Sequence, residues 1–551
     1  MPLGTLLAEQ GSRQKEKVDV NRASHITLAL LLWPFLLLAQ KDVVTFSAPG
    51  GFYEESFNLT LHCADSLHIR YTLNGNTPTS SSTLYSDALF LDNNKAYSKS
   101  NFYTIVNTIP SRFYQPKDVD RAIVIRAAAF DGNERRIGEV ETQSYFIRSL
   151  GCDFHGLPVV SLVADSVDLF DDERGIFVPG VHYDVKDSTA TGNYCQTGYD
   201  WEREANFEFY EPDNSGVNQI CGLRTHGGAS RWYQQKGMKL YARREYSNKR
   251  FDHDFFGQHL EKGYKRLVLH PFQCSNWLKT GGQDYLSQRV AAHSDLDIDA
   301  LGVRQTVVFI NGEYWGIYTL EESPDQHYVS LHYNLDKEKI NLIKWWRTVK
   351  HGDITDSWQL LRWMSNSDLN KPEDSIYAFS RWDMSNVLDY LVFEIYSSNL
   401  DWPHNNVMMW QRETGEPFRF IFFDGDGCFS ELSSLALEKA TNSGRDSRAI
   451  NFFFGGACFR KMFVNRFREL LTTTFSYDTL KSYLDEYHDL VKDEIGRQSA
   501  RFKCPLNETQ WANDIKKVDA FFRLRNTLFE RELADFLKTQ YADTLSMDLN
   551  H

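Results

Sequence analysis

Polar side chains flank a short predicted β-hairpin in the second half of the chain. Asp401 and Asn406 precede the hairpin, and Asp424 and Asp426 follow it in the run Asp-Gly-Asp-Gly. Phosphoryl transfer needs such a set, because one carboxylate orients or deprotonates the acceptor hydroxyl while an amide and a second carboxylate hold Mg²⁺ against the nucleotide phosphates. The pattern therefore favours a phosphoryl-transfer site.

Other interpretations of these residues stay open on spacing alone. Asp-Gly-Asp-Gly is also a common surface turn, and an Asp–Asn loop is often a capping turn. The Asp-x-Asp spacing also fits the metal site of a glycosyltransferase. An EF-hand calcium loop is excluded, because the twelfth position counted from Asp424 is Leu435 rather than Glu.

The elements around these residues are predicted from the hydrophobic pattern. Residues 382–400 carry apolar side chains at helical spacing, and Pro403 blocks continuation of that helix. Residues 407–410 and 418–423 are β-type runs separated by a turn. A helix, a loop and a hairpin should therefore hold the polar residues. In protein kinases the base and the metal-binding Asn are five residues apart and a hairpin separates them from the metal-binding Asp, as here.

Cations that could contact phosphate stand upstream. Residues 224–231 form a turn rich in Gly, Ser and Arg, and Lys236 and Lys239 follow it in a β-type run. Small residues let backbone amides approach phosphate oxygens, and the side chains of Arg231 and the lysines neutralise their charge. A plain basic surface turn is the alternative.

A second predicted hairpin ends in acidic residues. Residues 304–310 and 313–320 are joined by an Asn-Gly turn, a strong hairpin signal. Glu321 and Glu322 follow it, and Lys344 lies further on. Either glutamate can pair with a phosphate-directed lysine, or both can be solvated charges at the rim.

The region from about residue 46 to residue 147 alternates short β-type runs with turn clusters, which predicts a small antiparallel sandwich. Its run IRYTLNGNTPT at residues 69–79, with Leu84-Tyr85, residues 125–127 and residues 142–147, resembles the chitobiase/β-hexosaminidase C-terminal-type domain. This resemblance implies an Ig-like accessory module without chemistry of its own.

From roughly residue 158 to residue 540 the chain resembles the spore-coat protein H (CotH) kinase family. The resemblance rests on the Gly/Ser/Arg turn with its lysines, on NGEYWGIY at residues 311–318, on the loop 399–406 and on FFDGD at residues 422–426. It implies an atypical kinase-like fold that transfers phosphate from ATP to protein Ser or Thr.

The resemblance also implies roles for individual residues. Asp401 corresponds to the catalytic Asp, Asn406 and Asp424 correspond to ligands of Mg²⁺ or Mn²⁺, and Asp426 corresponds to a second metal ligand or a structural carboxylate. The expected nucleotide contacts are Arg231, Lys236, Lys239 and Glu322, with Lys239 favoured over Lys236 as the phosphate-contacting lysine.

The N-terminus and the composition bear on location and partners. Residues 26–39 are apolar, too short to span a membrane and preceded by basic residues, which predicts a signal peptide at 1–40 and no transmembrane span after cleavage. A secreted, cell-surface or periplasmic protein is therefore expected.

The chain of 551 residues carries a net charge of −14 and no long Lys/Arg run, so we expect no nucleic-acid partner. Its eight cysteines include no Cys-x-x-Cys pair, which disfavours a zinc ribbon.

Together these observations predict an α+β chain with an all-β sandwich at 41–150 and a kinase-like domain at 157–540. The expected activity is transfer of phosphate from ATP to a protein substrate with Mg²⁺ or Mn²⁺. The alternative is a catalytically silent surface or adhesion protein that binds a glycan or another protein, with the sandwich as the candidate glycan-binding module.

Overall fold

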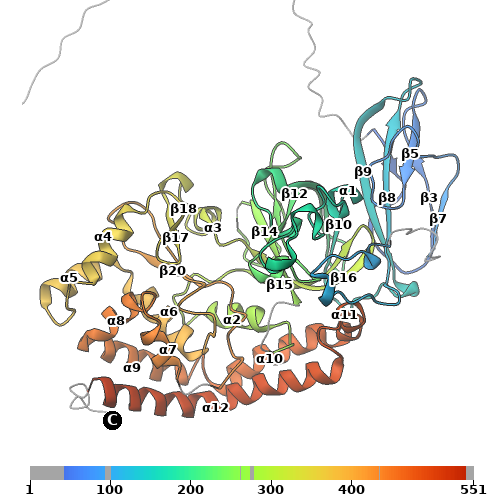
Figure 1. Ribbon diagram of the computed structural model, residues 1–551. Helices are drawn as coiled ribbons and strands as arrows, with labels where there is room; N and C mark the ends of the chain where they lie inside the picture. The colour runs from blue at the N-terminus through green and yellow to red at the C-terminus, as the bar shows by residue number, and fades with distance from the viewer. Residues whose placement is uncertain (1–42, 93–100, 261, 273–277, 433–434, 542–551) are drawn as a thin grey trace, which may run out of the picture. The chain divides into compact units, whose positions relative to one another are not determined.

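The computed structural model describes residues 43–92, 101–260, 262–272, 278–432 and 435–541 (Figure 1). The predicted signal peptide at 1–40 lies outside these residues. The described chain is a mixed α/β structure whose strands come mainly from its first half and whose helices come mainly from its second half. The expected α+β fold class, with a β-rich N-terminal part, is confirmed.

The N-terminal strands form a five-stranded sheet in the order β2-β9-β8-β5-β6, together with the pairs β1-β4 and β3-β7. Apolar side chains from both groups, including Leu59, Ile69, Ile125 and Tyr145, share one core. The strands are β1 Thr45–Phe46, β2 Gly51–Tyr53, β3 Phe57–Leu59, β4 Leu61–His62, β5 His68–Thr72, β6 Thr83–Leu84, β7 Leu89–Leu91, β8 Ile123–Phe130 and β9 Arg136–Ile147.

The next strands close into a barrel in the order β10-β11-β12-β13-β14-β16-β15. Its strands are β10 Val159–Val163, β11 Arg203–Tyr210, β12 Gly216–His226, β13 Gly237–Tyr241, β14 Arg266–Pro271, β15 Val303–Ile310 and β16 Glu313–Glu322. β10 and β15 pair in parallel, and the other neighbours are antiparallel. Because side chains alternate along a strand, Leu240, Leu269 and Leu320 fill one core while the opposite face is free to carry polar groups.

The second half contains a small sheet and a helical bundle. The sheet has the order β18-β17-β19-β20, with β17 Asn341–Lys344, β18 Thr348–His351, β19 Met408–Gln411 and β20 Arg419–Ile421. The helices are α1 Ser166–Phe170, α2 Gln283–Ala291, α3 Gln326–His332, α4 Thr355–Met364, α5 Pro372–Arg381, α6 Met384–Tyr396, α7 Ala436–Asn442, α8 Arg448–Gly455, α9 Ala457–Leu471, α10 Tyr477–Val491, α11 Ile495–Phe502 and α12 Glu508–Gln540.

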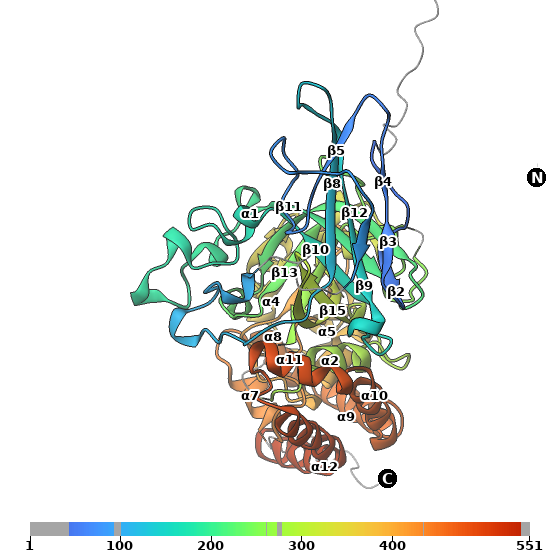
Figure 2. The ribbon, with the colours of Figure 1, turned by 90° about the vertical axis from the view of Figure 1, so that its right-hand side faces the viewer.

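Helices α2 and α11 join the barrel to the bundle. Helix α2 contacts β15, helix α11 contacts β16, and α10 packs on α2 and on α12 (Figure 2). Helix α6 is buried along its whole length except for its first turn, and its apolar side chains belong to the large core of the second half. This buried helix ends immediately before the loop that carries Asp401.

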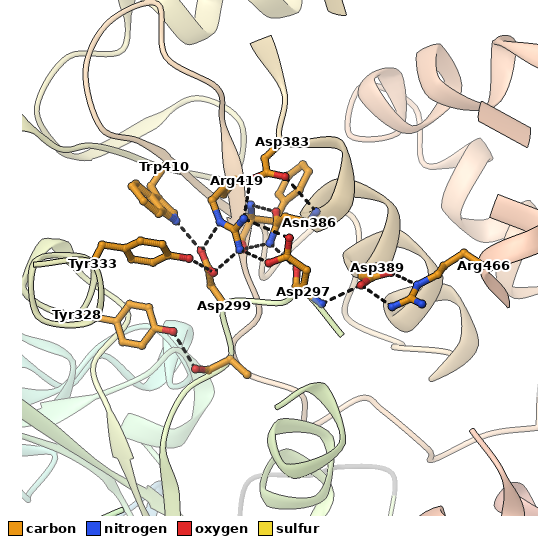
Figure 3. Close-up of polar contacts among 12 residues, drawn as sticks. Asp297, Asp299, Tyr328, Tyr333, Asp383, Asn386, Asp389, Trp410, Arg419 and Arg466 are labelled. Carbon is orange, nitrogen blue, oxygen red and sulfur yellow. Dashed lines mark hydrogen bonds and ion pairs between the residues drawn. The ribbon is translucent and has the colours of Figure 1, made fainter. Parts of the chain in front are cut away.

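Arg419 fixes the hairpin β19–β20 against α6 and against the segment that follows α2 (Figure 3). Its guanidinium lies 2.6 Å from Asp297, 2.8 Å from Asp299 and 2.6 Å from Asp383, the N-cap of α6. Asp389 on α6 forms a further ion pair with Arg466 on α9 at 2.6 Å. The contacts of Arg419 hold β20, the strand that leads to Asp424, and the pair of Asp389 and Arg466 joins α6 to α9.

Within the described ranges, no helix is both long and apolar enough to cross a membrane. The cysteines in those ranges are free thiols.

Candidate active site

An acidic cluster surrounds His270 where the barrel meets the second half of the chain. His270 on β14 lies with its Nδ1 atom 3.8 Å from Oε1 of Glu321 on β16. Its Nε2 atom lies 4.0 Å from Oδ1 of Asp424 and 3.7 Å from Oδ2 of Asp426. Asp284, in the first turn of α2, completes the cluster because its ligand atom lies within 4.8 Å of those of His270 and Glu321. Strand, helix and loop residues far apart in the sequence thus converge.

The electrostatics of this cluster call for a cation. Burial and the neighbouring carboxylates, Asp284 first among them, hold the pKa of Glu321 well above its usual range. Burial also raises the pKa of Asp426 to about 7, although His270 opposes the rise. Neither Oδ2 of Asp284 nor Oε1 of Glu321 has a hydrogen-bond donor among the described residues. Buried carboxylate oxygens without donors, next to an imidazole, suit hard divalent cations such as Mg²⁺ and Mn²⁺.

His270 is the cationic counterpart within the cluster. Burial alone would lower the pKa of its imidazole, but the charges of Asp426, Asp284 and Asp424 outweigh burial, so the pKa is raised. One imidazolium cannot balance all of these carboxylates. The set therefore fits a bound metal ion better than it fits a self-sufficient salt-bridge network.

The loop after α6 brings Asp401 to the edge of the cluster. Oδ2 of Asp401 accepts hydrogen bonds from the amides of Asn405 at 2.9 Å and Asn406 at 3.2 Å. The Asn406 amide also donates to the backbone carbonyl of Asp424 at 3.2 Å. Asn406 thereby links the loop to the Asp-Gly-Asp-Gly turn, and the structure brings together Asp401, Asn406, Asp424 and Asp426 as the sequence predicts.

The backbone at both sides of this link is left-handed. Asn406 has a φ of 53° and Asp424 has a φ of 61°. This region is costly for residues other than glycine, although Asn and Asp tolerate it better than most, and such conformations gather at functional sites. The surrounding contacts must therefore stabilise the local geometry.

Contacts with helices α6 and α7 also support the Asp401 loop. Asn399 donates to Oε2 of Glu394 at 2.9 Å and accepts from the backbone amide of Asp401 at 3.1 Å. Lys439 on α7 donates to the carbonyls of Asn399 and Leu400. Asp401 is left with 34% of its side chain exposed, so it is both oriented and accessible.

Lys239 lies on the same face of the barrel as the acidic cluster. Val268 pairs with Lys239 on β13 and with Glu321 on β16, and because alternate residues share a face, His270 lies on this face as well. The ammonium of Lys239 donates to Ser323 at 2.5 Å and lies 3.8 Å from Oδ2 of Asp325. Burial lowers the pKa of Lys239 to about 8, with Asp325 opposing the shift.

Lys344, at the end of β17, is a second cation at the site. Its Nζ atom lies 4.7 Å from the ring centroid of Phe423, the residue before Asp424. Burial lowers the pKa of Lys344, whereas the charges of Asp424 and Asp401 act in the opposite direction. Lys344 therefore lies close enough to both carboxylates to contribute to the field that a phosphate group would meet.

The other expected nucleotide contacts are engaged inside the protein. The ammonium of Lys236 is buried and donates to the carbonyls of Arg231 at 2.9 Å and Tyr233 at 3.0 Å. Arg231 itself donates to the carbonyl of Cys195 at 3.2 Å. The structure does not bring either side chain to the acidic cluster.

Glu322 points away from its neighbour Glu321. It accepts from the backbone amide of Gly302 at 2.9 Å and lies 2.9 Å from the imidazole of His332. From the sequence, either glutamate could pair with a phosphate-directed lysine; in the structure Lys239 lies beside Asp325 instead.

Sequence reasoning did not single out His270 or Asp284, and it considered Glu321 only as a partner of a phosphate-directed lysine. Successive side chains of a strand point to opposite faces of the sheet. Once β16 is known to include both glutamates, Glu321 and Glu322 must therefore lie on opposite faces. His270 and Asp284 sit in no local motif, so only their spatial proximity reveals them.

Comparisons with known proteins match both parts of the chain. Residues 223–529 match the family model described as CotH kinase protein. This chain belongs to the CotH kinase family. Residues 48–141 match the model described as chitobiase/beta-hexosaminidase C-terminal domain. Both resemblances inferred from the motifs are thus confirmed.

Among solved structures, the CotH-family chain matches one titled "Crystal structure of A Helicobacter pylori proinflammatory kinase CtkA". The identity is 9%, the TM-score is 0.25, and the match covers 54% of this chain and 94% of that chain. No curated protein matches the chain.

Proposed function

We propose that this CotH-family protein is an atypical kinase that transfers phosphate from ATP to Ser or Thr of a protein substrate. The observation that carries the proposal is the convergence of Asp284, Glu321, Asp424 and Asp426 on His270, beside a loop that presents Asp401. Membership of the family supports the reaction class.

A divalent metal ion fits the donor set. Asp424 and Asp426 would hold it, and the side-chain amide of Asn406 lies next to them. Asp284 and Glu321 offer further buried oxygens. ATP would supply the phosphoryl group, and bound Mg²⁺ or Mn²⁺ would neutralise charge on the phosphates. Without such an ion these carboxylates repel one another.

Asp401 is the proposed base. The two amides on its Oδ2 atom fix the carboxylate plane, and the exposed side chain can accept a hydrogen bond from an acceptor hydroxyl. The hydroxyl oxygen forms the new bond to phosphorus, the bond from phosphorus to the ADP oxygen breaks, and the hydroxyl proton passes to Asp401. Lys239 and Lys344 neutralise phosphate charge on either side.

We further propose that the sandwich at 41–150 is an accessory module to a catalytic domain at 157–540, and that the protein works outside the cytoplasm. The family match at 48–141 supports the module. The apolar run at residues 26–39 supports export. A glycan stays a candidate ligand of the module.

Substitution of Asp401 tests the proposal. Asp401→Asn keeps the shape and removes the base, so phosphate transfer from labelled ATP to a protein mixture should fall by about 10²- to 10⁴-fold. Asp252→Asn is the matched control, because Asp252 is exposed and lies outside the cluster. Transfer that is unchanged in Asp401→Asn would contradict the assignment.

A further inference from the structure

A groove next to the Asp401 loop combines exposed tryptophan with arginine. We call it the Trp–Arg groove. It measures about 740 Å³ and is formed by the turn after β17, by helix α4 and by the segment that leads into α8. Its aromatic lining is Trp345, Trp346 and Trp358, and its cationic lining is Arg347, Arg362, Arg445 and Arg448.

The groove is positively charged within an acidic protein. Asp446 is the single carboxylate among the described residues that line it, and it lies 3.7 Å from Arg347. Arg362, Arg445 and Arg448 are exposed and form no ion pair with a described residue. Because the whole chain carries a net charge of −14, such an uncompensated group of arginines is a local exception that attracts anions.

Hydrogen bonds connect the groove to the proposed base. The indole N–H of Trp345 donates to Oδ1 of Asn405 at 2.7 Å, and Asn405 donates to Oδ2 of Asp401 at 2.9 Å. A group bound against Trp345 is therefore separated from Asp401 by one side chain. Such a group lies next to the place where an acceptor hydroxyl must sit.

The turn that carries the tryptophans adopts an unusual conformation. Trp345 has a φ of 54° and Trp346 a φ of 63°, so two successive bulky residues are left-handed. Such residues are strained, and strain of this kind is retained mostly at binding and catalytic sites. Trp358, on α4, is 57% exposed, an uncommon setting for a tryptophan that has no ligand.

The groove continues away from the site. A second hollow of about 590 Å³ shares Met364, Ser365 and Arg448 with it and reaches Phe452 on α8. An elongated, partly aromatic channel suits an extended peptide, whose side chains alternate along its length.

We propose that the Trp–Arg groove binds acidic side chains of the protein substrate beside its acceptor residue, so that the enzyme prefers Ser or Thr flanked by Asp, Glu or phosphorylated residues. This inference rests on the proposed function because it takes the bound protein to be a kinase substrate. Binding in the groove does not itself require catalysis. Arginine pairs with carboxylate and phosphate alike. A nucleic acid is a poorer occupant, because its continuous charge would meet the acidic remainder of the protein.

The test uses the full chain and inert peptides. The first peptide is labelled with fluorescein and has alanine at the acceptor position, flanked by glutamates. A second peptide has glutamines in place of these glutamates. Fluorescence anisotropy without ATP compares the affinities of the two peptides for the protein. We expect the glutamate peptide to bind more tightly, and its affinity to fall as salt is raised. A third peptide with phosphoserine in place of the glutamates separates a preference for phosphate from one for carboxylate.

The double variant Arg362→Gln/Arg445→Gln should weaken binding of the glutamate peptide by about 2- to 30-fold, since each exposed ion pair contributes roughly 0.2–1 kcal/mol. Arg244→Gln, an exposed arginine outside the groove, is the charge-matched control and should leave binding unchanged. Equal affinity for the glutamate and glutamine peptides would overturn the proposal, as would unchanged binding in the double variant. Equal binding of single-stranded oligonucleotide would overturn it in favour of a general polyanion site.

A transfer assay with serine restored to the peptides separates this inference from the proposed function. If acidic peptides bind in the groove but receive no phosphate, the kinase assignment fails and the binding site stands. If phosphate is transferred equally well to glutamate and glutamine peptides, the kinase assignment stands and the acidic preference fails.

Discussion

Each carboxylate of the site has a counterpart that determines its role. Asp401 accepts two amide hydrogen bonds on Oδ2, its Oδ1 atom lies 3.3 Å from the imidazole of His404, and 34% of its side chain is exposed, which suits a base. Asp424 and Asp426 lie beside an imidazole and other carboxylates, which suits metal ligation. Glu394 is buried, and only its Oε2 atom receives a hydrogen bond in the structure, so it positions the Asp401 loop through Asn399.

Glu394 should make stability depend on pH. Burial raises the pKa of Glu394 from 4.5 to about 8. Between these values the folded protein keeps the proton that the unfolded chain has lost, so the free energy of unfolding falls as pH rises, by up to about 1.4 kcal/mol per pH unit. Glu394→Gln keeps the contact with Asn399 and removes this contribution.

Urea unfolding from about pH 5 to pH 8 therefore gives a shallower decline for Glu394→Gln than for the unaltered protein. Glu139→Gln, at an exposed position, is the control and should keep the original slope. Identical slopes for all three proteins would show that Glu394 is ionised in the folded state.

At the scale of elements, the site depends on how the hairpin β19–β20 is held. Arg419 on β20 joins three aspartates, and Asp299 among them is 4% exposed at its side chain (Figure 3). Trp410 on β19 and Tyr333 also donate to Asp299, at 2.7 Å and 2.5 Å. These contacts join the hairpin, α6 and the segment after α2, and both site loops extend from the joined elements.

Arg419→Gln should destabilise the protein by about 3 kcal/mol, because it leaves a buried carboxylate without its cation. Arg419→Lys should recover only part of this loss, since one ammonium cannot reproduce the paired contacts of a guanidinium. Arg523→Gln removes an exposed ion pair with Asp519 and should cost less than about 1 kcal/mol. The midpoints of urea unfolding compare the variants, and equal losses for Arg419→Gln and Arg523→Gln would contradict this role for the hairpin.

At the scale of the whole molecule, the sandwich packs directly on the barrel. Phe146 of β9 lies among Phe154, Tyr210 and Phe309 in one buried apolar group. Beside it, Ser144 donates its backbone amide to the buried carboxylate of Glu208 on β11 at 3.0 Å. The sandwich is therefore part of the structural support of the barrel.

The sequence was informative where a pattern is local and uninformative where the site is assembled over distance. The hairpin of β15 and β16, the strand β13 and the helix α6 follow from alternation, an Asn-Gly turn and helical spacing, all of which lie within short windows. Asp401 and Asn406 could be found because one loop holds them.

His270 and Asp284 could not be found in this way, because barrel closure and helix α2 bring them to the cluster. Lys236 illustrates the reverse case. Its position in a basic turn suggests a phosphate contact, yet the fold buries its ammonium against backbone carbonyls. Whether a lysine faces a ligand depends on which face of the strand enters the core, and the turn alone does not determine that.

We propose that metal and nucleotide bind at the cluster of Asp424 and Asp426. The most direct measurement is thermal unfolding of the full chain with and without Mg²⁺ and ATP, for the unaltered protein, for Asp424→Asn and for the control Asp252→Asn. Ligand at a hundred times its Kd adds about 2.7 kcal/mol. Asp424→Asn, which keeps a residue that tolerates a positive φ, should be at least as stable without metal because it relieves repulsion.

We expect a metal-dependent rise in the unfolding temperature for the unaltered protein and for Asp252→Asn, and no rise for Asp424→Asn. The same rise in all three proteins would place the ligand elsewhere. No rise in a well-folded protein would contradict a nucleotide site at this cluster.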